Sequence, residues 1–265
     1  MKIVCLKGGL GNQMFEYCRF RDLMESGHDE VYLFYDHRRL KQHNGLRLSD
    51  CFELELPSCP WGVKLVVWGL KICRAVGVLK RLYDDEKPEA VLIDDYSQHR
   101  RFIPNARRYF FSRQFLAELQ SGFVQMIRAV DYPVSVHVRR GDYLHPSNSS
   151  FGLCGVDYFQ QAIAYVRKKR PDARFFFFSD DMEWVRENLW MEDAVYVEHT
   201  ELLPDYVDLY LMTLCRGHII SNSTFSFWGA YLAVDGNGMK IYPRRWFRDP
   251  TWTSPPIFSE EWVGL

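Results

Sequence analysis

Residues 134–143 read VSVHVRRGDY, an apolar run that ends in a cluster of charged side chains. The apolar half is typical of a buried β-strand, and a polar loop follows it directly. Arg139 and Arg140 stand beside Gly141 at the strand end, where guanidinium groups are costly to bury without an anion. Because a guanidinium binds a phosphate through two parallel hydrogen bonds, the segment predicts a phosphate site in which Asp142 orients one arginine. The alternative is a structural Arg–Asp pair at a loop.

Apolar runs alternate with helical patterns in both directions from this stretch. Downstream, we predict strands at 175–178, 194–197, 218–221 and 240–242, and helices at 156–169, 182–189, 204–215 and 225–233. Upstream, we predict strands at 3–6, 31–35 and 91–93, a helix from residue 14 and another over 115–129. Such alternation implies an α/β chain with parallel sheets covered on both faces. The length fits two small domains, and Pro133 marks the predicted boundary between residues 1–132 and 133–265.

Three further polar clusters follow predicted strands, at the position where parallel sheets bind ligands. Residues 8–13 read GGLGNQ, where glycines allow positive φ and a close approach of the backbone to a ligand. Residues 179–181 read SDD, and we expect one aspartate to cap the next helix and the other to bind. Residues 221–226 read SNSTFS, which predicts a phosphate cradle at a helix N-terminus. Each cluster has a structural alternative, but four of them converging on one sheet edge favour a site.

Composition argues against several other classes of protein. The formal net charge of −1 gives no reason to expect a nucleic-acid partner. The seven cysteines lack zinc-site spacing, and neither a signal peptide nor a membrane-spanning stretch is evident, which fits a reducing cytoplasm. No Asp-x-Asp pair occurs, so the usual carboxylate pair for a metal–nucleotide complex is missing and we expect no bound metal. The Gly-x-Gly-x-x-Gly fingerprint of dinucleotide-binding proteins and the P-loop are missing as well. Arginine and helix dipoles would then have to stabilise a diphosphate leaving group.

Residues 61–83 carry five basic side chains and no acidic one. Apolar residues recur there at helical spacing, at Leu65, Trp68, Ile72, Val76 and Leu79. A basic amphipathic helix can lie on an anionic membrane, which would allow peripheral contact with the inner membrane. An ordinary surface helix packed on the sheet is the interpretation we favour.

Taken together, these segments resemble the bacterial α-1,2-fucosyltransferase family, glycosyltransferase family 11. The matching segments are 8–17 (GGLGNQMFEY), 137–143 (HVRRGDY), 178–188 (FSDDMEWVREN) and 208–231 (DLYLMTLCRGHIISNSTFSFWGAY). The resemblance implies a GT-B-like fold, with two Rossmann-like domains, an acceptor-side one first, and a donor cleft between them. It also implies GDP-L-fucose as donor, a terminal galactose of a glycan as acceptor, inversion at the anomeric carbon and no metal or other cofactor.

The resemblance also assigns roles to residues of the site. Arg139, with Arg140, would hold the diphosphate, and His137 with Asp180 or Asp181 would face the guanine. The other expected donor-binding positions are Gly9, Gly11, Ser223, Thr224 and Ser226. Asn12 would lie near the fucose and share the catalytic role with Arg139. Asp142 is the candidate general base, with the alternative that it only orients an arginine.

The sequence also departs from the family pattern, and these departures concern the acceptor and the linkage more than the donor. Glu16 replaces the usual Gln, and residues 95–99 read DYSQH where Tyr-x-Gln-Ser is common. Three rival functions stay open: a non-catalytic GDP-sugar-binding protein, a transferase of another GDP-sugar or linkage, and a nucleotide-binding oxidoreductase. The acceptor could be free or lipid-linked, as in O-antigen or capsule synthesis.

Overall fold

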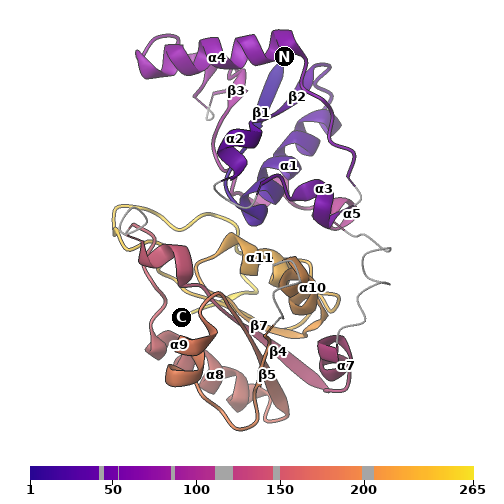
Figure 1. Ribbon diagram of the computed structural model, residues 1–265, viewed down its shortest axis with the longest axis vertical. Helices are drawn as coiled ribbons and strands as arrows, with labels where there is room; N and C mark the ends of the chain where they lie inside the picture. Colours follow the sequence, from indigo (N-terminus) through magenta and orange to yellow (C-terminus); the bar gives the residue numbers. More distant parts are fainter. Residues whose placement is uncertain (42–44, 53, 85–86, 111–121, 146–149, 199–205) are drawn as a thin grey trace. The chain divides into compact units, whose positions relative to one another are not determined.

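The computed structural model describes the chain apart from residues 42–44, 53, 85–86, 111–121, 146–149 and 199–205 (Figure 1). The chain divides into two compact units, residues 1–113 and 114–265. The division lies earlier than the predicted boundary at 132/133, because α7 (Gly122–Arg128) packs against α10 (Tyr206–Leu214) of the second unit. Both units combine helices with a parallel sheet, which confirms the α/β prediction.

A three-stranded parallel sheet in the order β2-β1-β3 forms the first unit's centre. Its strands are β1 (Lys2–Leu6), β2 (Val31–Tyr35) and β3 (Leu92–Ile93). Ile3 and Cys5 of β1 pack with α4 (Trp61–Ala75), whereas α1 (Leu10–Glu25) also contacts β1 and β2. Val4 and Leu6 alternate with Ile3 and Cys5 and are buried as well, so both faces of this sheet are covered.

The first unit also contains several shorter helices. They are α2 (His37–Leu40), α3 (Leu48–Cys51), α5 (Ala106–Tyr109) and the 3-10 helices η2 (Lys80–Leu82) and η3 (Arg100–Phe102). The basic segment is thus helical over 61–75, and Gly77 and Leu79 take positive φ before η2.

The second unit holds six parallel strands in the order β6-β5-β4-β7-β8-β9. The strands are β4 (Tyr132–Val138), β5 (Ala173–Ser179), β6 (Val195–Tyr196), β7 (Gly217–Ile219), β8 (Lys240–Tyr242) and β9 (Val263–Gly264). Counted from β4, this is the order 3-2-1-4-5-6 of the dinucleotide-binding fold. The direction of winding reverses between β4 and β7, and such folds bind ligands at the carboxyl ends of the strands flanking that point.

Large apolar side chains cover both faces of this second sheet. Its helices are α8 (Val156–Lys169), α9 (Met182–Asn188) and α11 (Thr224–Tyr231), with α7 and α10, and the 3-10 helix η4 (Gly141–Leu144) follows β4. All seven residues of β4 are buried, and Val134, Val136 and Val138 pack with α8 and α9. Phe176 and Phe178 alternate with Phe175 and Phe177 along β5, so they point to the other face of the sheet, and they are also fully buried. Figure 1 shows the helices α10 and α11 of this unit.

Most strands and helices lie where the sequence predicts them. The strand at 31–35, the helix at 156–169 and the strand at 240–242 match residue for residue, whereas the two-residue β9 was not predicted. Of the helix predicted over 115–129, α7 is confirmed, and Phe115 and Leu119 lie outside the described residues. Residues 204 and 205, the predicted start of the helix now labelled α10, lie outside them too.

Replacing Gly238 by alanine should destabilise the second unit. A Cβ at this position would lie 1.4 Å from the carbonyl oxygen of Arg216, a backbone atom that can move only together with the chain leading into β7. Overpacking of this kind costs about 1–3 kcal/mol, so we expect Gly238→Ala to lower the melting temperature clearly. Gly122→Ala is the matched control, because Gly122 lies at the exposed start of α7 in the same unit and a Cβ there meets nothing within 4 Å. Equal melting temperatures for the two variants would contradict the packing described here.

Candidate functional site

The sequence suggested that the four polar clusters converge on one sheet edge, but they lie on two different sheets. The GGLGNQ segment follows β1 of the first unit, whereas the clusters after β4, β5 and β7 belong to the second. The register places Val138 of β4 beside Ser179 of β5. The next residues, Arg139 and Asp180, therefore leave neighbouring strands together, beside the point where the strand order reverses.

Two arginine–aspartate pairs form the centre of this edge. Arg139 Nη1 lies 3.1 Å from Asp180 Oδ2, and Arg140 Nε donates to Asp181 Oδ2 at 2.9 Å. The Arg140 guanidinium also lies over the ring of Trp184, 4.0 Å from its centroid. The hydrogen bond from Arg140 holds the pKa of Asp181 below its ordinary value.

The two arginines differ in exposure. The side chain of Arg140 is 15% exposed and lies between a carboxylate and an indole, whereas that of Arg139 is 34% exposed. Arg139 thus presents more of its charge at the surface, with Asp180 holding the guanidinium on one side and the Tyr143 ring 5.9 Å away. Of the two arginines, Arg139 is the better placed to meet an anion.

Gly141 lies close to the neighbouring carboxylate. A Cβ at this position would lie 2.6 Å from Asp180 Oδ2, so a larger residue would force the Asp180 side chain to shift from its place beside the loop. Asp180 Oδ1 also accepts a hydrogen bond from the backbone N–H of Arg140 at 2.9 Å. The carboxylate of Asp180 thereby orders the loop after β4 while it pairs with Arg139.

Asp181 caps α9, which confirms the expectation that one of the two aspartates is a helix cap. Its side chain accepts from the backbone N–H of Trp184 at 3.2 Å, while Ser179 Oγ accepts from the N–H of Asp181 at 3.0 Å. Asp180 is left as the carboxylate of the predicted binding role, which the structure does not test.

His137 is a buried, neutral group behind these pairs. Its Nδ1 and Ser221 Oγ share a hydrogen bond of 2.9 Å between β4 and the segment after β7, and the ring lies beside Phe225. Burial lowers the pKa of His137 to about 4, so the imidazole is uncharged at neutral pH. An uncharged imidazole suits contact with a base or hydroxyl more than with a phosphate.

The SNSTFS segment joins β7 to α11. Ser223 is the N-cap residue of α11 and Thr224 its first residue, whereas Ser226 is fully buried and donates to the Ser223 carbonyl at 3.0 Å. The hydroxyl of Ser226 thus stabilises the helix start, and the backbone N–H groups of the first turn are the donors that suit an anion.

Asn222 is a structural residue that the sequence did not single out. Its Nδ2 donates to the carbonyls of Gly152 and Trp246 at 2.9 and 2.8 Å, and its own carbonyl accepts from the Tyr143 hydroxyl. An asparagine between two polar serines carries no distinguishing local pattern, so only the fold reveals this role.

Beside Tyr143 lies a hollow of about 700 Å³ lined by Tyr158, Arg245 and Phe247 among others; Arg139 and Asp180 do not line it.

In the first unit, the glycine-rich turn is shorter than predicted. Gly9 is the N-cap residue of α1, so Gly11 and Asn12 already belong to the first helical turn. Gly8 has φ of +70°, and a Cβ there would lie 2.7 Å from the Asn12 amide, which explains the glycine at this position. Asn12 Oδ1 accepts from Gln98 Nε2 at 3.0 Å and links α1 to the segment after β3.

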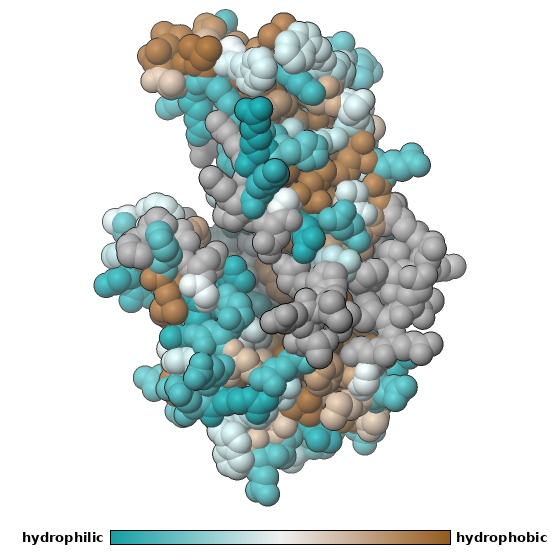
Figure 2. All heavy atoms as spheres, in the orientation of Figure 1, coloured by the Kyte–Doolittle hydropathy of each residue, from teal (hydrophilic) through white to brown (hydrophobic). Residues whose placement is uncertain are grey.

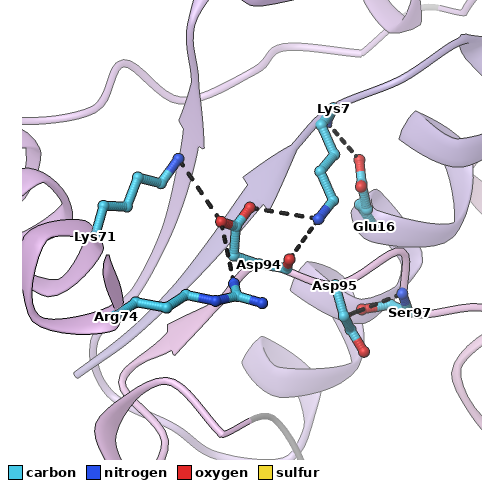
Figure 3. A network of polar contacts seen from close by, with 7 residues as sticks. All are labelled: Lys7, Glu16, Lys71, Arg74, Asp94, Asp95 and Ser97. Atoms are coloured by element: carbon cyan, nitrogen blue, oxygen red, sulfur yellow. Dashed lines mark hydrogen bonds and ion pairs between the residues drawn. The ribbon is translucent and has the colours of Figure 1, made fainter. Parts of the chain in front are cut away.

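A charged network surrounds Asp94 at the carboxyl end of the same sheet (Figure 3). The Asp94 carboxylate lies 3.5 Å from Lys7 Nζ, 3.8 Å from Lys71 Nζ and 3.5 Å from Arg74 Nη1. Asp95 points elsewhere and accepts from the backbone N–H and the hydroxyl of Ser97. No pattern in the sequence singles out Asp94, which links the ends of β1 and β3 to α4.

Glu16 is buried next to this network. Its Oε2 accepts from the backbone N–H of Lys7 at 2.8 Å, and burial raises the carboxyl pKa well above its usual range. The raised pKa favours the neutral acid, which has one donor and one acceptor like the Gln that is usual in the resembled family.

Three further expectations concern features that are absent from, or not described in, the described part of the chain. The side chain of Asp142, the candidate base, lies outside the described residues. Within the described ranges, no three His, Cys, Asp or Glu side chains are grouped to hold a metal ion. Likewise, none of the helices in the described part of the chain is long and apolar enough to cross a membrane.

The sequence profile of glycosyl transferase family 11 matches residues 101–265, which include all of the second unit's strands and helices described above. The chain belongs to glycosyl transferase family 11. The resemblance inferred from the four sequence segments is therefore confirmed, and the arginine pairs at the end of β4 lie within the matched range.

Three relatives of this family 11 chain are similar over nearly its whole length. The O-antigen biosynthesis glycosyltransferase WbnK of Escherichia coli is 25% identical, over 98% of this chain and 99% of its own. An α-1,2-colitosyltransferase of E. coli is 28% identical, over 98% and 97%. The galactoside 2-α-L-fucosyltransferase SEC1 of Bos taurus is 34% identical, over 98% and 72%.

Acid should destabilise this family 11 protein through two buried histidines. Burial lowers the pKa of His137 to about 4 and that of His218, which bonds to Ser135, to about 3, both below the ordinary 6.5. The unfolded chain therefore binds more protons as the pH falls below 6.5, and stability is lost. Each histidine should remove about 2 kcal/mol of the free energy of unfolding between pH 7 and pH 5.

Urea unfolding followed by tryptophan fluorescence across this pH range measures the effect. Asn in the His218→Asn variant can still bond to Ser135 but does not titrate. The part of the slope of the free energy of unfolding against pH that the two histidines contribute should therefore fall by roughly half. An unchanged slope in this variant would show that acid acts through other groups.

Proposed function

We propose that this chain is a galactoside α-1,2-fucosyltransferase. It would transfer L-fucose from GDP-fucose to the 2-hydroxyl of a terminal galactose in a glycan, with inversion at the anomeric carbon and without a metal ion. The observation that carries the proposal is the Arg139–Asp180 pair at the strand-order reversal of a family 11 chain. Support for the linkage comes from the fucosyl- and colitosyltransferase relatives that match nearly the whole chain.

In the proposed reaction the acceptor oxygen attacks the anomeric carbon while the bond from that carbon to the diphosphate oxygen breaks. The bonding electrons pass to the departing GDP, and the hydroxyl proton must go to a base. Arg139 would stabilise the negative charge as it grows on the diphosphate, and the first-turn N–H groups of α11 would add to it. The absence of any Asp-x-Asp pair in the sequence supports charge stabilisation by the protein alone.

The remaining site residues would position the donor. Asp180 fixes the Arg139 guanidinium, and neutral His137 with Asp180 would face the guanine base. Arg140 and Asp181 would hold α9 and the loop in place, since both are engaged with each other and with Trp184. By the family resemblance, Asn12 would have a part in the reaction and the glycines beside it in donor binding.

The base is proposed to be Asp142, with orientation of an arginine as its other possible role. Asp142→Asn kinetics across pH separates these roles. Loss of the acidic limb of the pH–rate profile supports a base, whereas a uniform drop in rate at every pH supports orientation.

The location and acceptor belong to the same proposal. All seven cysteines are free thiols, which supports a reducing compartment such as the cytoplasm. The relative named for O-antigen biosynthesis supports an O-antigen glycan as acceptor, either free or lipid-linked.

Arg139→Ala should lower the turnover number by about 10²–10³, the usual effect of removing one donor that stabilises transition-state charge. Arg167→Ala is the matched control, because Arg167 also pairs with a single aspartate, Asp193, on the surface of the same unit. Both variants should melt like the parent protein. Near-parental turnover of the Arg139 variant would remove Arg139 from the mechanism.

Incubation with GDP-fucose and a panel of galactosides, followed by NMR of the product, tests the reaction itself. We expect an α-1,2 linkage. The α-1,2-colitosyltransferase relative favours one specific second candidate, transfer of colitose, so GDP-colitose and GDP-mannose should compete in the same assay. Preferred transfer of colitose would replace the fucose proposal, and GDP binding without turnover would support the non-catalytic alternative.

A further inference from the structure

Helix α4 has two apolar faces, and the sheet uses only one of them. Val63, Val67 and Leu70 are buried and pack on β1, β2 and β3. This face accounts for the attachment of the helix to the first unit, as an ordinary surface helix requires.

The opposite face is a continuous apolar stripe exposed to solvent. Trp61, Leu65, Trp68 and Ile72 follow one another at intervals of four, three and four residues, and are 64%, 50%, 49% and 65% exposed. Figure 2 shows hydrophobic residues gathered over α4 at the top of the view. The rings of Trp61 and Trp68 contact each other edge to face, with centroids 5.7 Å apart.

This stripe continues beyond the end of the helix. Val76, Val78 and Leu79 are each at least half exposed. The favoured interpretation, a surface helix packed on the sheet, is confirmed through Val63, Val67 and Leu70. The apolar residues that recur over 65–79 lie on the outer face of that helix and beyond its end. Large exposed apolar patches of this kind usually mark an interaction surface.

The stripe is bordered by positive charge. Residues 61–83 contain five basic side chains and no acidic one, although the whole chain has a net charge of −1. Lys71 and Arg74 turn inward to Asp94, whereas Lys80 and Arg81 are exposed and Lys64 half-exposed. The surface thus combines tryptophan and aliphatic groups with cations.

We propose that this outer face of α4, together with residues 76–81, docks on the surface of an anionic phospholipid membrane. Tryptophan is favoured at the level of the lipid headgroups, aliphatic groups bury below them, and lysine and arginine pair with anionic headgroups. A second copy of the chain fits the surface less well. A two-fold contact would bring the Lys64, Lys80 and Arg81 side chains of both copies into one interface, where like charges repel.

Flotation with phospholipid vesicles tests the proposal without donor or acceptor, so its outcome is independent of the proposed reaction. The full chain should bind mixed phosphatidylcholine–phosphatidylglycerol vesicles more tightly than vesicles of phosphatidylcholine alone. The double variant Trp61→Ser, Trp68→Ser and the charge variant Lys64→Gln, Lys80→Gln, Arg81→Gln should each lower the bound fraction, with the apparent affinity falling about tenfold or more.

Trp190→Ser is the matched control, since Trp190 is 65% exposed but lies in the second unit without such a stripe; it should bind vesicles like the parent chain. All variants should keep the parental melting temperature, because the replaced side chains are on the surface. Equal binding of parent and α4 variants would overturn the proposal. Self-association of the parent in sedimentation velocity that the tryptophan variant abolishes would equally overturn it, in favour of a contact between copies.

Discussion

A guanidinium that follows a fully buried strand needs an anion close by. In this chain the neighbouring strand of the same sheet supplies it, because aspartates follow that strand. β4 is buried along its whole length, so Arg139 and Arg140 reach the surface only at its end. β5 runs parallel and in register, and brings Asp180 and Asp181 to the same level. The loop, the start of α9 and the position of both arginines all depend on this pairing.

The two pairs differ in their contacts and in how much of the guanidinium is exposed. Asp181 caps α9 and holds Arg140, whose other face stacks on Trp184, so this pair fixes the backbone. Asp180 holds Arg139, whose charge stays more exposed, and the missing side chain of Gly141 makes room for that carboxylate. A partly exposed guanidinium held in place by a carboxylate suits the proposed stabilisation of a developing charge, because such a donor need not reorganise during the reaction.

Charge is organised differently in the first unit. Asp94 gathers three cations from β1's end and from α4, so the inner side of α4 is tied to the sheet by ion pairs as well as by apolar contacts. The helix is therefore held firmly while its outer face remains exposed. Burial raises the carboxyl pKa of Glu16 well above its usual range, at a position where the resembled family usually has an amide.

Sequence alone determined the strands, most of the helices and the polar clusters after the strands, because each depends on local patterns: apolar runs, helical spacing and strand-end glycines. The predicted boundary at Pro133 already placed residues 8–13 and 137–143 in different domains, but the sequence could not show the order of the strands within each sheet, since strand order is set by packing between distant segments. It could not tell which aspartate caps and which pairs with Arg139, because the register of β4 and β5 fixes that. Nor could it orient α4, whose periodicity marks a stripe without saying whether the sheet or the solvent faces it. The tertiary structure decided that question, because only the sheet's contact with Val63, Val67 and Leu70 leaves the tryptophans outside.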